Sequence, residues 1–316
     1  MPPLHLVTPY WPHRGLPESG HGAGRETWVK MDAYQPTGSF KIRGIGHLCQ
    51  RLASQGAKAF VSSSGGNAGY AAAYAGRALG VPTTVVTPSS TAQDMREKIA
   101  SLGAEVLVEG EVWDEADAFA RAIVARGEAA YVPPFDHPLL WEGHSTLVDE
   151  MLAQIPNGSP APDAVVVAVG GGGLLCGVAA GLDRHGLKDT TILAVETEGA
   201  ASFAGAVAAG ELITLEKITT IASTLGAKRV TGQALDWAKR RPITPVIVSD
   251  ADAVRGIARF ADDHQCLVEP ACGAALSLAY DDHPALKPFK RIAVIACGGV
   301  AVSLEKLAGW RERFGV

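Results

Sequence analysis

The stretch from Ala164 to Leu182 reads AVVVAVGGGGLLCGVAAGL, and it decides how the rest of the chain is interpreted. It carries no charge and reaches the length of a membrane span. Its four consecutive glycines, however, would each cost a helix about 1 kcal/mol relative to alanine. The stretch is therefore predicted to be a buried strand from Val165 to Val169, a glycine turn, and a helix that begins at Leu174. We expect a soluble protein with no membrane partner.

Strand-like and helix-like segments alternate along almost the whole chain. The helical segments are rich in alanine, and two have capping-box spacing near their start: Thr91 with Asp94, and Ser249 with Asp252. This alternation predicts the α/β class, with parallel sheets covered by helices on both faces. The predicted strands are 58–62, 83–87, 104–109, 164–169, 191–196, 245–249 and 291–296.

A domain boundary is expected in the segment YVPPFDHP, residues 131–138, where three prolines separate one series of strands and helices from the next. The four earliest strands are expected to form a smaller sheet, and the later strands a larger one. The predicted domains are a small one, 37–137, and a large one, 1–36 plus 138–316. A cleft between two α/β units is where a small ligand is expected.

Composition excludes several classes of protein. The chain has 316 residues, of which 47% are hydrophobic and 19% charged, so a sizeable core is expected. The net charge of −5 and the lack of a basic run argue against a nucleic-acid partner. Two prolines directly after Met1 argue against a secretory signal. Five cysteines without CxxC spacing indicate neither a disulfide framework nor a zinc site, which suits reduced thiols in the cytoplasm.

The segment QPTGSFKIRG, residues 35–44, contains the first candidate catalytic residue, Lys41. Turn residues precede this lysine, and an apolar helical run follows it. The start of a helix disfavours positive charge, and destabilising an ammonium frees the amine as a nucleophile. A solvated surface lysine is the alternative, and for this segment alone it is the more common case.

Two loops between a strand and a helix have the composition of anion-binding sites. The segment SSSGGNAG, Ser62 to Gly69, exposes several backbone N–H groups and suits a carboxylate, although an ordinary capped loop fits equally well. The glycines from Gly170 to Gly173 let the backbone wrap closely round a phosphate. They do not fit the dinucleotide fingerprint G-x-G-x-x-G, because Leu175 stands at the last glycine position.

Two further motifs are weaker. Cys297 follows the apolar segment RIAVIA at the end of a predicted parallel strand, where ligands gather, but a lone cysteine there is more often part of the core. The segment Gly143-His144-Ser145-Thr146-Leu147 nearly matches the hydrolase motif G-x-S-x-G. It lacks the second glycine and lies in a predicted helix, so a hydrolase is rejected.

Taken together, these segments resemble the β-family, or fold type II, of pyridoxal-phosphate enzymes, and within it the serine dehydratase group. The resemblance runs from about Trp28 to Leu304. It implies two open, twisted, mostly parallel sheets with the cofactor in the cleft between a large and a small domain, and it implies a homodimer. The motifs that carry it are QPTGSFKIRG, SSSGGNAG, PPFDHPLLWEGH, VGGGGLLCG, VEPACGAAL and ACGG.

The resemblance also implies roles for individual residues. Lys41 would carry pyridoxal 5'-phosphate on its amine, Phe40 would stack on the cofactor ring, and Asn67 would bind the ring hydroxyl. Cys297 would face the ring nitrogen, as is typical of the serine dehydratase group, and a neutral thiol there makes the ring a weaker electron sink. The remaining implied contacts are the cofactor phosphate with Gly170, Gly171, Gly172, Gly173 and Leu174, and the substrate carboxylate with Ser64, Gly65, Gly66, Asn67 and Ala68.

A monovalent cation such as K⁺ is implied as well. The matching positions are Gly170, Glu196, Ala200, Leu225 and Ala227.

Two residues depart from the pattern of the group. Gly65 stands where some members have alanine, which should leave more room near the carboxylate site. Thr224 falls where a small alanine usually covers the second face of the ring.

The implied reaction is β-elimination from L-serine, and from L-threonine as a further amino-acid substrate, with Lys41 as the base that removes the Cα proton. Alternatives remain open: a weak or inert pyridoxal-phosphate-binding relative, or another amino-acid lyase of the same fold. A nicotinamide-dependent dehydrogenase is disfavoured by the failed fingerprint.

Overall fold

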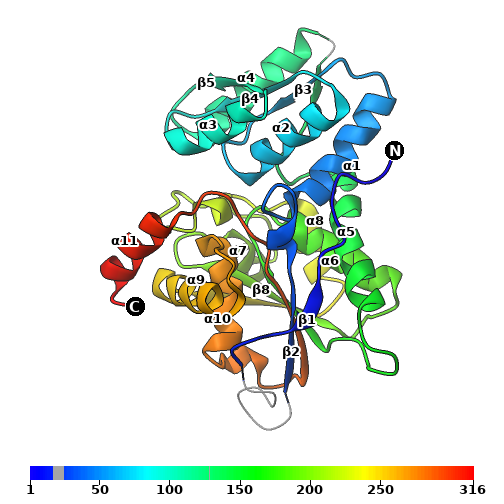
Figure 1. Ribbon diagram of the computed structural model, residues 1–316, viewed down its shortest axis with the longest axis vertical. Helices are drawn as coiled ribbons and strands as arrows, with labels where there is room; N and C mark the ends of the chain where they lie inside the picture. The colour runs from blue at the N-terminus through cyan, green and yellow to red at the C-terminus, as the bar shows by residue number, and fades with distance from the viewer. Residues whose placement is uncertain (17–24, 128) are drawn as a thin grey trace. The chain divides into compact units, whose positions relative to one another are not determined.

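The computed structural model describes residues 1–16, 25–127 and 129–316 (Figure 1). Its contacts divide the chain into two compact units. The first comprises Met1–Leu6 and Gln35–His144, and the second Val7–Tyr34 and Ser145–Val316. The first unit begins two residues before the predicted small domain, 37–137, and ends seven residues after it, and it also includes the N-terminal residues.

The first unit is built on a parallel sheet of strand order β5–β4–β3–β6. Neighbouring residues of a strand face opposite sides of a sheet, and both sides are covered here. Phe60 packs with α1 and α2 on one side, whereas Val61 packs with α4 on the other. The elements are α1 (Lys41–Ser54), β3 (Ala59–Ser62), α2 (Asn67–Leu79), β4 (Thr83–Thr87), α3 (Gln93–Ser101), β5 (Glu105–Val108), α4 (Trp113–Ala125) and β6 (Ala129–Tyr131).

The second unit contains the larger sheet, of order β1–β2–β10–β7–β8–β9. Its strands are parallel except at the β1–β2 pair. Every residue of the central strand β7 (Ala164–Ala168) is buried, which explains its unbroken apolar sequence. Pro12 and Pro245 lie on the two edge strands, where a missing backbone donor is tolerated.

The remaining elements are β1 (Tyr10–Pro12), β2 (Glu26–Lys30), η1 (Asp32–Tyr34), α5 (Pro138–Ala153), α6 (Gly173–Arg184), β8 (Thr191–Thr197), α7 (Ser202–Ala209), η2 (Ser223–Leu225), α8 (Gly232–Ala238), β9 (Ile243–Val248), α9 (Asp250–His264), α10 (Pro270–Tyr280), η3 (Pro284–Leu286), β10 (Arg291–Ile295) and α11 (Leu304–Phe314).

The α/β class and all the predicted strands are confirmed, with small shifts at their ends. The prediction that the four earliest strands form the smaller sheet is wrong, because the fourth, β7, pairs in the larger sheet. The smaller sheet takes β6 instead. Strands β1, β2 and β6 were not predicted. β1 and β6 have three residues each, too few to show a periodicity, and β2 has a charged residue at each end.

One of the two predicted capping boxes is present. The Ser249 hydroxyl accepts the N–H of Asp252 at 3.1 Å, and the Asp252 carboxylate accepts the N–H of Ser249 at 2.8 Å. The other is wrong, since α3 begins after Ala92 without a side-chain cap.

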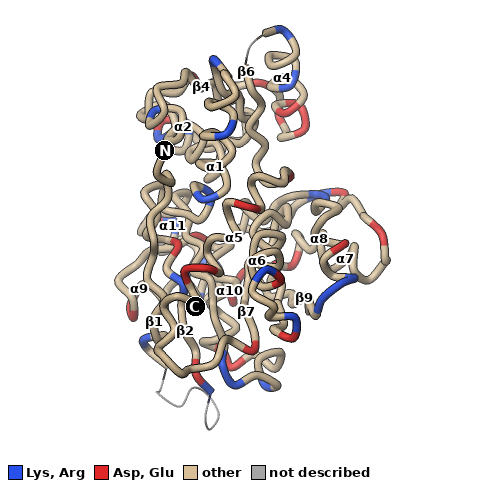
Figure 2. The backbone as a smooth tube through the Cα atoms, turned by 90° about the vertical axis from the view of Figure 1, so that its right-hand side faces the viewer, with Lys and Arg blue, Asp and Glu red and all other residues tan. Residues whose placement is uncertain are grey.

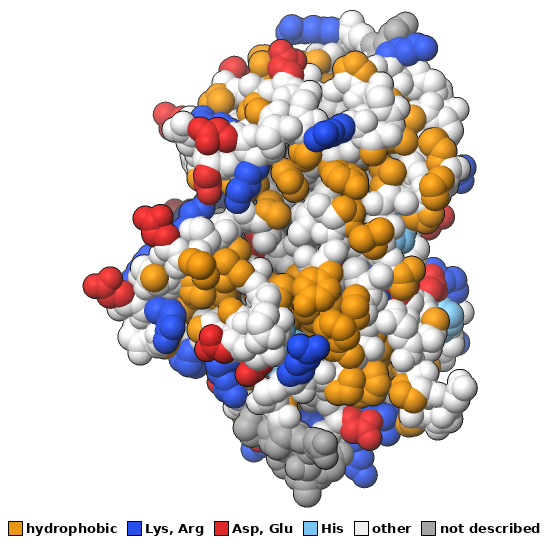
Figure 3. All heavy atoms as spheres, in the orientation of Figure 1, with side chains coloured by type: hydrophobic (Ala, Val, Ile, Leu, Met, Phe, Trp, Pro, Cys, Tyr) orange, Lys and Arg blue, Asp and Glu red, His pale blue; other side chains and the backbone are white. Residues whose placement is uncertain are grey.

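Charged residues of both signs are spread along the chain (Figure 2). On the face shown in Figure 3, neither sign gathers into a continuous patch. Among the described helices, none is both long and apolar enough to cross a membrane.

A cluster of buried rings in the second unit contains two histidines. His13 and His264 meet edge to face with ring centroids 4.8 Å apart, and Phe260 stacks on His264 at 4.4 Å. Within the described residues, neither nitrogen of the His264 ring has a hydrogen-bond partner. Burial lowers the pKa of His264 to about 4 and also lowers the pKa of His13. Both rings are therefore neutral in the folded protein near pH 7.

This cluster predicts acid sensitivity. Unfolded His264 binds a proton below about pH 6.5, whereas the folded residue does so only near pH 4, so the free energy of unfolding should fall as the pH drops through this window. At roughly 1.4 kcal/mol per pKa unit, His264 contributes on the order of 3 kcal/mol to this fall. Urea denaturation of His264→Leu should show a shallower dependence on pH than the original chain. His264→Gln, which also cannot titrate, should show the same flattening even if it unfolds more easily; unchanged slopes in both variants would contradict the prediction.

Candidate active site

Lys41 is the first residue of α1, as predicted, and Phe40 precedes it at the helix N-terminus. The Lys41 ammonium donates to the backbone carbonyl of Pro134 at 2.6 Å, and its Nζ lies 5.2 Å from the centre of the Phe40 ring. The Phe40 ring in turn lies 4.9 Å from that of His144. A positive charge at this end of a helix is disfavoured, so the position suits a lysine that reacts as the neutral amine. Sequence reasoning missed Pro134, because a carbonyl acceptor carries no side-chain signal.

The predicted carboxylate loop connects β3 to α2. The helix begins at Asn67 without a side-chain cap, so its first N–H groups can serve a ligand. Asn67 and Ala68 are buried, whereas Ser64 and the two glycines are half-buried. A Cβ atom on Gly69 would lie 1.8 Å from the Ser64 carbonyl oxygen, so this close approach of loop and helix requires glycine.

The structure does not leave the extra room expected at Gly65. A Cβ atom there would lie 2.3 Å from the hydroxyl oxygen of Thr91 and 2.6 Å from its methyl carbon. Thr91 already fills the space that an alanine methyl group would take. The expectation failed because Thr91 reaches the loop from the end of a different strand.

The four-glycine loop connects β7 to α6 and has the shape of a backbone cradle. Gly172 has φ of +88° and precedes the helix, which has no side-chain cap. Cβ atoms would collide at both ends of the loop: at Gly170 with Leu225 Cα, 3.0 Å away, and at Gly172 with the Ala234 methyl, 2.9 Å away. Gly173 and Leu174 form the first turn of α6, whose N–H groups favour an anion. The loop therefore fits a phosphate group.

Cys297 is buried and lies two residues after the end of β10. A hydrogen bond with Cys272, together with burial, raises the pKa of the Cys297 thiol well above its usual value, so the group is neutral. Nearby, the Glu269 carboxylate occupies the space beside the Cα of Gly299 and accepts the hydroxyl of Thr224 at 2.7 Å. The Thr224 hydroxyl is thus held by a buried carboxylate that sequence reasoning did not identify.

Glu196, the acidic residue of the predicted cation site, is fully buried. Its two oxygens accept the N–H groups of Phe203 and Ala204, each at 2.8 Å, at the start of α7. Burial raises the pKa of Glu196 to about 7. Of the other predicted positions, Leu225 lies against Gly170. Among the described residues, no group of three or more His, Cys, Asp or Glu side chains is placed to hold a metal, so a cation here would depend on carbonyl oxygens.

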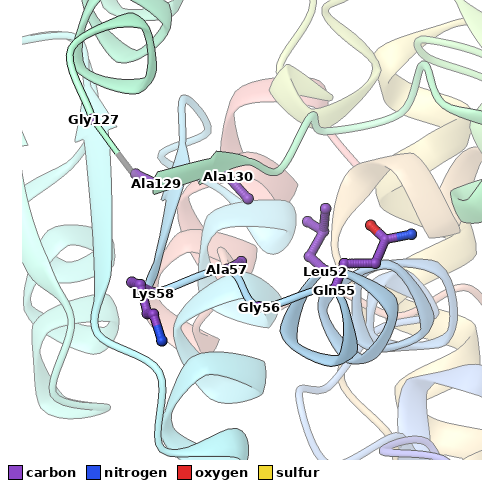
Figure 4. Close-up of a pocket in the computed structure, with 8 residues that line it drawn as sticks. All are labelled: Leu52, Gln55, Gly56, Ala57, Lys58, Gly127, Ala129 and Ala130. Atoms are coloured by element: carbon purple, nitrogen blue, oxygen red, sulfur yellow. The ribbon is translucent and has the colours of Figure 1, made fainter.

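A groove of about 420 Å³ lies in the first unit (Figure 4). None of the predicted site residues lines it. It is lined by Leu52, Gln55, Gly56, Ala57, Lys58, Gly127, Ala129 and Ala130.

Glycine-bearing loops at the carboxyl ends of parallel strands, uncapped helix N-termini and a lysine at a helix start define an α/β enzyme that binds an anionic cofactor. The chain belongs to the pyridoxal-phosphate-dependent enzyme family, whose model matches residues 2–298. It is 46% identical to the human L-serine dehydratase/L-threonine deaminase over 99% of this chain and 97% of the human protein. It is 42% identical to the L-serine dehydratase of Dictyostelium discoideum, over 97% of this chain and 91% of that protein.

Solved structures show the same similarity. A fungal L-serine ammonia-lyase from Rhizomucor miehei superposes with a TM-score of 0.90 at 39% identity, over 98% of this chain and 99% of the fungal one. The fold type II architecture inferred from the motifs is therefore confirmed.

The glycine cradle makes a direct prediction about stability. Gly172→Ala should lower the free energy of unfolding of the cofactor-free protein by about 2–3 kcal/mol, since the left-handed backbone costs an L-residue 1–2 kcal/mol and the Ala234 contact adds to this. Gly186→Ala is the matched control in the same unit, with φ of +72° and no atom within 4 Å of the new Cβ. Urea denaturation should show the larger loss for Gly172→Ala. Equal losses would mean that the Ala234 contact does not constrain the loop.

Proposed function

We propose that this protein catalyses β-elimination from L-serine, which gives pyruvate and ammonia, and from L-threonine, which gives 2-oxobutanoate and ammonia. The observation that carries the proposal is 46% identity along the full length of a human protein named for both reactions. Six motifs that resemble those of the serine dehydratase group are also present, with departures at Gly65 and Thr224, and they include the neutral thiol of Cys297.

The residues of the chain fit pyridoxal 5'-phosphate. Lys41 supplies the amine for the covalent bond, Phe40 a ring to stack on the cofactor, and Asn67 an amide for its ring hydroxyl. The phosphate suits the uncapped turn formed by Gly170 to Leu174, where a Cβ atom on Gly170 or Gly172 would crowd the loop. Cys297 offers the ring nitrogen a neutral partner rather than a carboxylate.

The chain's own groups account for the handling of substrate and protons. The backbone N–H groups from Ser64 to Ala68 bind the substrate carboxylate. Lys41 Nζ, held near the Pro134 carbonyl, removes the proton from Cα. Bound pyridoxal phosphate supplies the electron sink for the pair left on Cα. Lys41 then returns the proton to the departing β-hydroxyl, which leaves as water, and the released enamine hydrolyses to the oxo acid and ammonia.

We propose in addition that a monovalent cation such as K⁺ supports the phosphate loop. Glu196 provides a buried carboxylate, and Leu225 brings backbone against Gly170. The backbone carbonyls of Gly170, Ala200, Leu225 and Ala227 are the further ligands, and carbonyl oxygens suit hard cations.

The assembly and location that we propose are a homodimer in the cytoplasm. The homodimer rests on the resemblance to the serine dehydratase group. The location rests on the five cysteines, all of which are free thiols.

The central prediction concerns Lys41. Lys41→Ala should lower pyruvate formation from L-serine by a factor of at least about 10³, because a positioned general base and a covalent anchor are lost together. It should also remove the yellow absorbance that is lost on borohydride reduction. Lys58→Ala, which removes an exposed lysine of the same unit, should keep both properties. Appreciable turnover by Lys41→Ala would overturn the assignment.

The cation proposal has its own test. Pyruvate formation should be several-fold faster in KCl than in tetramethylammonium chloride of the same ionic strength. Glu196→Gln, which keeps an acceptor for α7 but removes the charge, should lose this difference, whereas Glu216→Gln, an exposed glutamate of the same unit, should keep it. Equal rates of the original chain in both salts would exclude the cation site.

A further inference from the structure

Asp117, on α4, is the centre of a hydrogen-bond network in the first unit. Its Oδ1 atom accepts the hydroxyl of Ser63 at 2.7 Å and also the hydroxyl of Tyr131. Its Oδ2 atom accepts Nε of Arg121 at 2.7 Å, and the Arg121 guanidinium lies 4.3 Å from the centre of the Tyr131 ring. The Ser63 and Tyr131 oxygens are themselves 2.9 Å apart, so the network is closed.

The two hydroxyls belong to strand ends that lead to proposed active-site groups. Ser63 follows the last residue of β3 and directly precedes Ser64, the first residue of the carboxylate loop. Tyr131 is the last residue of β6, and the chain continues from it to Pro134, whose carbonyl accepts the Lys41 ammonium. A single carboxylate thus joins the strand that positions the substrate loop to the strand that positions the partner of the catalytic lysine.

The Asp117 carboxylate at the centre of the network remains ionised. Burial favours the protonated form of Asp117, but the hydrogen bonds from Tyr131, Arg121 and Ser63 outweigh burial and lower the pKa of the carboxyl group. Burial and the neighbouring carboxylate raise the pKa of Tyr131, so its hydroxyl remains a donor. Hydrogen bonds from these two neutral hydroxyls to a charged carboxylate are stronger than hydrogen bonds between neutral groups.

We propose that Asp117 is a positioning residue for the elimination reaction, acting through Ser63 on the carboxylate loop and through Tyr131 on the carbonyl partner of Lys41. This inference rests on the proposed function. The network has two arms: one runs from Asp117 through Ser63 to the carboxylate loop, and the other runs from Asp117 through Tyr131 to β6. A single substitution can break either arm.

Each arm has its own kinetic signature. Ser63→Ala removes the link to the loop and leaves the hydrogen bond from Tyr131 to Asp117 in place, so KM for L-serine should rise about fivefold to tenfold with kcat nearly unchanged. Tyr131→Phe removes the link to β6 and leaves the hydrogen bond from Ser63 to Asp117 in place, so kcat should fall about fivefold to tenfold with KM nearly unchanged. Asp117→Asn removes the charge and presents an amide to Arg121, and it should show both effects.

A binding measurement provides a readout that does not depend on turnover. L-Alanine has the carboxylate and amine of serine but no β-hydroxyl to eliminate, and its binding can be followed by the absorbance of the bound cofactor. Asp117→Asn and Ser63→Ala should weaken L-alanine binding about fivefold to tenfold, whereas Tyr131→Phe should not. The affinity for pyridoxal phosphate and the Tm of the cofactor-free protein should change little in Ser63→Ala and Tyr131→Phe.

The matched control is Glu105→Gln in the same unit. Glu105 accepts the hydroxyl of Thr84 at 3.0 Å, so the change from carboxylate to amide is chemically the same, but this pair is exposed and leads to no active-site group. KM, kcat and L-alanine affinity should all stay at their original values.

The inference is overturned if Asp117→Asn and Ser63→Ala bind L-alanine as tightly as the original chain. It is also overturned if the only change in all the variants is a lower Tm. The same holds if Ser63→Ala and Tyr131→Phe both lower kcat and raise KM together, because a purely structural role would give these results. If the original chain binds L-alanine but forms no pyruvate from L-serine, the proposed function fails. The L-alanine affinities of the variants then still decide the role of Asp117 and Ser63.

Discussion

Backbone N–H groups in the first turn of a helix require an acceptor, and two helices that follow a buried strand and a loop with consecutive glycines begin without a side-chain cap. They are α2 in the first unit and α6 in the second. Because the strands before them are parallel, both turns lie at the carboxyl edge of their sheet. Both turns therefore present backbone N–H donors to which an anion can bind. The proposed contacts to the cofactor phosphate and the substrate carboxylate both depend on this constraint.

Two buried side chains, Cys297 and Asp117, differ in their charge state. Cys297 is kept neutral by its thiol neighbour and by burial. Asp117 is kept ionised, although it is largely buried, because it accepts several hydrogen bonds. In the proposed function, the neutral thiol of Cys297 beside the ring nitrogen makes the cofactor a weaker electron sink. The charged carboxylate of Asp117 strengthens the hydrogen bonds that it accepts. The proposed chemistry thus needs both a weak and a strong electrostatic partner, and the fold provides them in separate units.

Three predictions differ from the structure: the room at Gly65, the capping box at Thr91 and the strands of the smaller sheet. The room expected at Gly65 is filled by Thr91, and the predicted capping box at Thr91 is not formed. The predicted strand 164–169 was assigned to the smaller sheet, where the short strand β6 stands instead. The errors at Gly65 and in the smaller sheet concern contacts between segments that are distant in the sequence, which no local pattern shows. Asp117 was missed for the same reason, since its partners Ser63 and Tyr131 lie at the ends of two different strands.

Local order along the chain determined the parallel α/β architecture, the glycine cradle from Gly170 to Gly173 and the place of Lys41 at a helix start. Such features depend on hydrophobic period, backbone freedom and helix electrostatics, which act over a few neighbouring residues. Tertiary structure alone decided that the Pro134 carbonyl accepts the Lys41 amine, that Glu269 holds Thr224, and that Asp117 joins two strand ends. These pairings arise when strands align side by side in a sheet, and no periodicity in a single strand records which neighbour it will have.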